Sequence, residues 1–142
     1  MNANVELGLR DWLDSSLEDG HPAVHTGLTG EEIPPEHPIV TVYVDRSQRA
    51  AGPLYRAFAK VIVSTPPHQG DDSGEAVESH RETCEAVRAI LQAPDAADPE
   101  SAFNSASGLH WKGGFLQGEN EGVSDGRWIT TFDFLVGLST AG

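Results

Sequence analysis

The fold is decided by the stretch Arg127-Trp-Ile-Thr-Thr-Phe-Asp-Phe-Leu-Val-Gly-Leu-Ser139. At a period of two, one face of this run is almost wholly apolar and comprises Trp128, Thr130, Phe132, Phe134, Val136 and Leu138. The other face is mixed, and Asp133 is its most polar point. β-Branched and aromatic side chains suit a pleated surface, and the run contains no proline. We therefore predict a strand inside a sheet, with one buried face.

The bulk composition restricts the class of protein. A chain of 142 residues is most simply one domain, residues 1–142. Lys+Arg 9 against Asp+Glu 22 gives a net charge of −13, which repels polyanions, so we expect no direct nucleic-acid binding and no anionic membrane as partner. No apolar run approaches the about 20 residues that a membrane-spanning helix requires. The single cysteine, Cys84, excludes an internal disulfide.

Three further segments have helical patterns. The first is an amphipathic helix at the amino terminus, whose apolar face comprises Val5, Leu9, Trp12, Leu13 and Leu17. A second helix is predicted over residues 74–92, with an apolar stripe that includes His80 and Cys84. A proline at the first helical position predicts a short helix over residues 99–106, with Phe103 as its buried anchor.

The remaining elements are strands and loops. The pattern predicts two antiparallel strands joined by a polar connection, over residues 39–44 and 54–65. It also predicts a strand with a glycine bulge over residues 109–116. Residues 21–38 form a Pro- and His-rich loop, and residues 117–126 form an acidic, Gly-rich loop. The predicted order is helix, strand, strand, helix, short helix, strand, strand. This order indicates an α+β fold: an antiparallel or mixed four-stranded sheet with helices packed on one face.

The histidines and the cysteine are the candidate metal ligands. His80 and Cys84 stand four residues apart on the second helix, a spacing that can bind a transition metal. Both lie on the apolar stripe, where cysteine behaves as a small hydrophobe, so we interpret them as core residues. His21, His25 and His37 lie in the first loop, for which a solvated loop is the simpler interpretation. A small metal-binding domain or metal-dependent enzyme built on these five residues is the alternative hypothesis.

Three arginines, Arg46, Arg49 and Arg56, cluster around the first hairpin. On a solvated connection such residues have no special role. Against a strongly acidic chain, they also suit one half of a subunit contact in which a neighbouring copy supplies the acids. We therefore take them as candidate interface residues.

Three stretches together resemble a known family. They are the strand pair 39–44 and 54–65 ending in Val-Ile-Val-Ser-Thr-Pro, the helix containing Glu-Ser-His-Arg-Glu-Thr-Cys-Glu-Ala-Val-Arg-Ala-Ile-Leu, and the closing Gly-Arg-Trp-Ile-Thr-Thr-Phe-Asp-Phe-Leu-Val. Their order and spacing are similar to the tail terminator (tail completion, minor tail) proteins of long-tailed bacteriophages and prophages. The similarity covers residues 39–139, and the loop 21–38 is longer than the family pattern.

The resemblance implies a structural protein of the virion tail, assembled in the bacterial cytoplasm. Such proteins cap the finished tail tube as a homo-oligomeric ring, usually a hexamer, and face the head connector. The family has no catalytic residues, so we expect no enzymatic activity and no cofactor. The expected partners are further copies of the chain, the tail-tube protein and the head-connector protein.

Overall fold

The computed structural model describes residues 1–17, 24–26, 38–66, 73–124 and 126–141. Within them the fold is α+β: three α-helices lie against a five-stranded mixed sheet. In chain order the elements are α1 (Asn2–Ser16), β1 (Val24–Thr26), β2 (Ile39–Ala51), β3 (Leu54–Thr65), α2 (Ser73–Gln92), the short 3-10 helix η1 (Pro94–Ala97), α3 (Pro99–Ser107), β4 (His110–Ser124) and β5 (Arg127–Ser139).

The sheet has the order β1-β2-β3-β5-β4. The closing strand β5 is an inner strand, as predicted, and it pairs antiparallel with β3 on one side and β4 on the other. β2 and β3 form an antiparallel hairpin, while β1 runs parallel to β2. The mixed character of the sheet therefore comes from β1 alone.

The predicted strand number of four is wrong, because β1 lies inside the segment 21–38 that was predicted as a loop. Val24 is buried, and the three residues of β1 pair with Val40–Val42 of β2. Three residues are too few to show a period of two in the sequence. The observed order therefore has an additional strand between the first helix and the first hairpin.

Two predicted connections are also wrong, because they are largely strand. β2 continues through the polar residues after Val44 as far as Ala51, and β4 continues through the acidic stretch 117–124. Each hairpin then closes over two residues, since Ala51 pairs with Leu54 and Ser124 pairs with Arg127. Gly52 has φ +54° and Gly126 has φ +75°, a backbone region that glycine occupies without strain. Hydrogen bonds between paired strands hold these polar segments, which an apolar pattern does not reveal.

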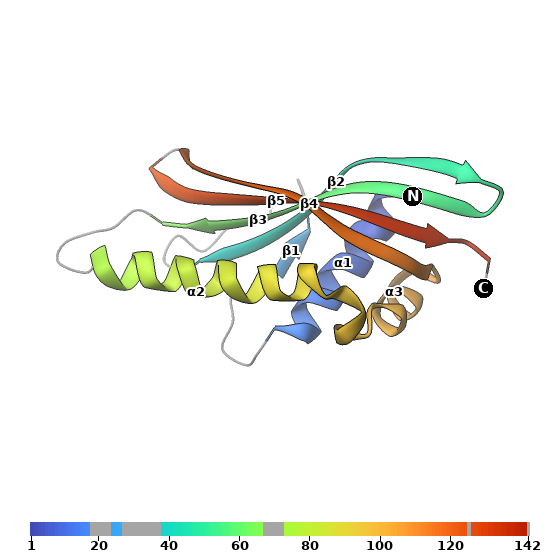
Figure 1. Cartoon of the computed structure of the whole chain (residues 1–142), viewed down its shortest axis with the longest axis horizontal. Helices are drawn as coiled ribbons and strands as arrows, with labels where there is room; N and C mark the ends of the chain where they lie inside the picture. Colours follow the sequence, from blue (N-terminus) through green and yellow to red (C-terminus); the bar gives the residue numbers. More distant parts are fainter. Residues whose placement is uncertain (18–23, 27–37, 67–72, 125, 142) are drawn as a thin grey trace.

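The helices lie together on one face of the sheet (Figure 1). Alternate residues of β2, β3 and β5 point toward them, and with the helices they form one apolar cluster. From α1 this cluster receives Val5, Leu9, Trp12 and Leu13, which are fully buried as the helical period predicted. Phe103 of α3 is fully buried as predicted. α1 and α3 pack closely because Gly8 of α1 faces the Phe103 ring.

The opposite face of the sheet has no helix of the described elements over it (Figure 1). The strand register places a row across this face, in which Arg46 is opposite Phe58, Phe58 opposite Leu135, and Leu135 opposite Phe115. Phe58 and Leu135 are half-buried, and Phe115 is 65% exposed. We call this side of the sheet the open face.

Candidate assembly surface

The positive charges are unevenly partnered. Four of the nine cations pair with a neighbouring acid, in the pairs Arg10–Asp11, Lys60–Asp133, Arg81–Glu78 and Arg88–Glu119. Arg127 donates instead to Ser64, from its Nε to the hydroxyl oxygen at 2.6 Å. The other four form no ion pair with an acid in the described ranges, and they are Arg46, Arg49, Arg56 and Lys112.

These four cations gather at one end of the sheet. Arg46, Arg49 and Arg56 lie on the β2–β3 hairpin, and Lys112 lies near the start of β4. All four are exposed. In a chain of net charge −13, this end therefore presents positive charge that forms no ion pair with an acid among the described residues. We call it the cationic end.

Aromatic rings hold two of the guanidinium groups. The Cζ atom of Arg46 lies 4.3 Å from the centre of the Phe58 ring. Arg49 donates from Nη2 to the Tyr55 hydroxyl oxygen at 3.1 Å, and its Cζ lies 5.6 Å from the Tyr55 ring centre. A cation over an aromatic face keeps its full charge, whereas an ion pair neutralises it. Arg46 and Arg49 therefore keep a charge that an external acid can meet.

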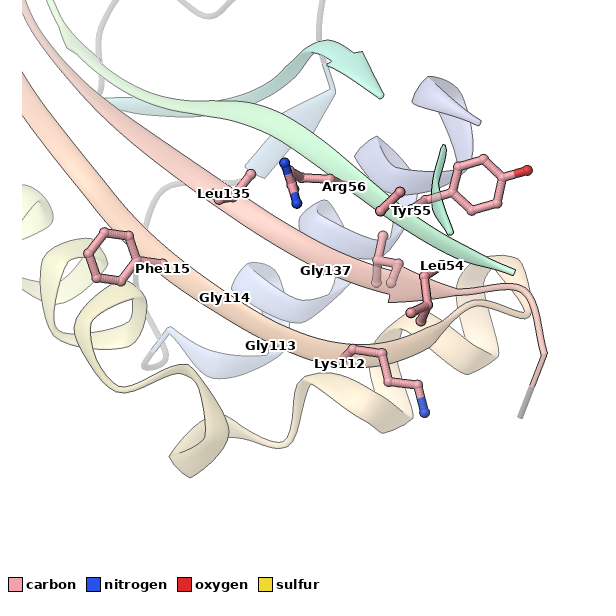
Figure 2. A pocket seen from close by; sticks show the side chains of 11 residues that line it. Leu54, Tyr55, Arg56, Lys112, Gly113, Gly114, Phe115, Leu135 and Gly137 are labelled. Atoms are coloured by element: carbon pink, nitrogen blue, oxygen red, sulfur yellow. The ribbon is translucent and has the colours of Figure 1, made fainter. Parts of the chain in front are cut away.

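A hollow opens on the same end of the open face, between β3, β5 and β4 (Figure 2). Its volume is about 320 Å³. Gly137 is opposite both Arg56 and Gly113 in the register, so two adjacent positions of the sheet have no side chain there. Leu135 and Phe115 border the hollow on one side and Leu54 borders it on the other, while Arg56 and Lys112 contribute charge (Figure 2).

Among the described residues, the lining of the hollow is mostly apolar; its polar side chains are Tyr55 and the two cations, and it includes no acid. The volume is near the lower limit of small-molecule pockets, about 300–1,000 Å³. Such a space suits an apolar side chain accompanied by a carboxylate. It is the part of the candidate surface that the sequence did not predict, because the pairing of Gly113 with Gly137 depends on the register of distant strands.

The structure places two of the predicted metal ligands in contact, since the Sγ of Cys84 lies 3.5 Å from the Nε2 of His80 on the same helix. Cys84 is buried on α2 and His25 lies in β1, while His21 and His37 fall outside the described residues. Across the described ranges, no group of three or more His, Cys, Asp or Glu side chains is arranged to share a metal ion.

His80 instead fastens α2 to the sheet. Its Nδ1 lies 2.5 Å from the hydroxyl oxygen of Thr65, and its Nε2 lies 2.9 Å from that of Thr130. Both threonines are buried, so the imidazole satisfies two polar groups at the helix–sheet interface. Burial lowers the pKa of His80, although Glu121 opposes this effect. Burial also raises the pKa of the Cys84 thiol, which disfavours a nucleophilic thiolate at that position.

A bidentate ion pair joins the same helix to the edge strand. Arg88 donates from Nε and from Nη2 to the two carboxylate oxygens of Glu119, each at 2.8 Å. This hydrogen bonding lowers the pKa of Glu119 and raises the pKa of Arg88. The contact lies on the helix side of the sheet and leaves the open face free.

In comparisons with known proteins, no family model matches the sequence, and no curated protein matches it significantly. None of the helices in the described part of the chain is long and apolar enough to cross a membrane.

Proposed function

We propose that this protein is a non-enzymatic assembly subunit of the tail of a long-tailed phage or prophage. In this role it caps the tail tube as an oligomeric ring and joins the tube to the head connector. The proposal rests on its resemblance in sequence to tail terminator proteins and on the properties of one surface.

The observation that carries the proposal is the cationic end. An acidic protein with its unpaired cations gathered at one end is complementary to its own remaining surface, so copies attract one another in a head-to-tail sense. Head-to-tail contacts that close after a fixed number of copies give a ring. The net charge of −13 also suits a ring through which DNA passes, because an acidic surface does not retain DNA.

The open face supports the same role. Phe115, Leu135 and Phe58 form an apolar row across this face that is not fully buried. Exposed apolar area bordered by charge is typical of a protein contact surface.

The proposal is tested on intact particles. Tails are purified from an induced host that carries a tagged copy of the gene, and the tag is labelled with gold for electron microscopy. We expect label at the head-proximal end of the tube only. Absence of the protein from purified tails, or label along the whole tube, would contradict the proposal. Metal analysis of the purified protein tests the metal-binding alternative, which requires a stoichiometric ion.

A further inference from the structure

The end of the sheet opposite the cationic end has a complementary character. There the register aligns Val123 of β4 with Trp128 of β5 and Thr65 of β3, whereas Arg56 and Gly137 are aligned near the other end. Figure 1 shows the tips of the β2–β3 and β4–β5 hairpins pointing away from each other at the two ends. The two hairpins thus lie at opposite ends of one sheet, and they differ in the side chains that they expose.

The β4–β5 hairpin presents an apolar side chain close to an acid. Val123 is 70% exposed, the highest fraction of any large hydrophobic residue in the described ranges. Glu121, two residues earlier in β4, is exposed. It belongs to none of the ion pairs among the described residues. A single exposed valine is ordinary on a protein surface. Its combination with an exposed carboxylate matches the hollow, which offers an apolar lining and two exposed cations.

We propose that the β4–β5 hairpin end of one copy seats in the hollow of the next copy. Val123 packs against Leu135 and Phe115, and the Glu121 carboxylate lies between the Arg56 and Lys112 side chains. This inference rests on the proposed function, because it names the two surfaces through which the ring subunits meet. The two surfaces differ, so the contact is heterologous and propagates from copy to copy until the ring closes.

Gly137 keeps the receiving surface open. A Cβ at this position would meet its nearest atoms, the Gly113 carbonyl oxygen and the Lys112 Cβ, at 3.8 Å, which is ordinary contact. Its backbone also lies outside the left-handed region. A larger residue is therefore compatible with the strand itself, and it would act mainly by filling the hollow.

A single-stranded nucleic acid is the competing occupant, since exposed aromatic rings interleaved with cations also bind stacked bases. The net charge of −13 disfavours it at long range, whereas the acidic hairpin of a second copy has the required charge and an apolar side chain. We therefore assign the hollow to a second copy.

The test is a charge exchange followed by sedimentation velocity. Arg56→Glu and Glu121→Lys each place like charges in the contact, and we expect each to raise its dissociation constant at least tenfold. In an equimolar mixture the two variants can alternate around the ring. At every second contact the native Glu121 of one variant then meets the native Arg56 of the other. At the contacts between these, the lysine introduced by Glu121→Lys meets the glutamate introduced by Arg56→Glu, so that opposite charges still face each other. We expect the mixture, and the double variant alone, to recover assembly close to that of the wild-type protein.

Two size variants test the apolar half of the contact. Gly137→Leu and Val123→Ser each remove the apolar fit, and we expect a rise of about ten- to a hundredfold in the dissociation constant. Circular dichroism checks that both variants keep the fold. The matched charge controls are Arg81→Glu and Glu82→Lys, which lie exposed on α2 and should leave assembly unchanged.

Each outcome is decisive. If the wild-type protein assembles and all four contact variants assemble equally well, this inference is overturned and the proposed function stands. Variants that weaken assembly without rescue in the mixture also overturn it. A wild-type protein that stays at 15.2 kDa at every concentration overturns both. Tight binding of a labelled oligonucleotide that Arg56→Glu abolishes, with assembly unchanged, assigns the hollow to nucleic acid instead.

Discussion

We expect the Gly8→Ala substitution to destabilise the protein, although alanine usually stabilises a helix relative to glycine. Gly8 is buried inside α1, where alanine normally stabilises a helix by about 1 kcal/mol relative to glycine. Here a Cβ would lie 2.9 Å from Cγ of Phe103, and closer still to Cδ1 and Cε1. Overpacking a core costs about 1–3 kcal/mol, and the Phe103 ring has little room to move because it is fully buried against Trp111. We therefore expect Gly8→Ala to lower the free energy of unfolding by up to about 2 kcal/mol, the overpacking cost less the gain in helix propensity.

The assay is urea unfolding followed by tryptophan fluorescence. Ser105→Ala, at an exposed position of α3, is the control and should change stability by less than about 0.5 kcal/mol. Phe103→Leu removes part of the obstructing ring, so Gly8→Ala should be less harmful in that background, with a coupling of about 0.5–3 kcal/mol. A Gly8→Ala variant that gains about 1 kcal/mol, as on an exposed helix, would refute the close packing of α1 on α3.

The structure makes three more predictions. The pKa of His80 is lowered in the folded state, so the unfolded chain takes up a proton first, and stability falls as the pH drops below about 6.5. His80→Gln should flatten this acid limb in urea titrations, and an unchanged pH profile would contradict the role given to His80. Arg88→Gln should cost about 1 kcal/mol after allowance for solvent screening, and it should return the pKa of Glu119 toward its ordinary value in an NMR titration. Gly126→Ala should destabilise the protein by about 1–2 kcal/mol because its φ is +75°, and an unaffected urea midpoint would argue against that turn.

The parts of the fold that bury a periodic apolar face were predictable from the sequence. Alternation identified β5 as an inner strand, the helical spacing of Leu9 and Trp12 identified α1, and Phe103 was expected as an anchor. In each case a side-chain pattern coincides with burial, and burial provides most of the stabilisation.

The missed parts depend on backbone pairing. β1 is too short to show a period, and the polar ends of β2 and β4 are held by hydrogen bonds to a neighbouring strand. One sequence signal was available for the β4–β5 hairpin, because Asp125-Gly126 is a favoured two-residue turn between strands.

Only the arginines of the candidate surface were predictable from the sequence. Arg46, Arg49 and Arg56 follow from charge and position, and the structure places all three exposed on one hairpin. Lys112 and the glycine-floored hollow require the register between β4 and β5, which no local pattern supplies.

The most direct test of the central claim is the mass of the untagged protein in dilute buffer, measured by light scattering over a wide range of concentration. The claim is that this chain is a building block that binds copies of itself through oppositely charged ends. It predicts a closed species with a mass that is a whole multiple of 15.2 kDa and that dissociates as salt is added. A mass of one copy at every concentration, with no response to salt, would contradict it.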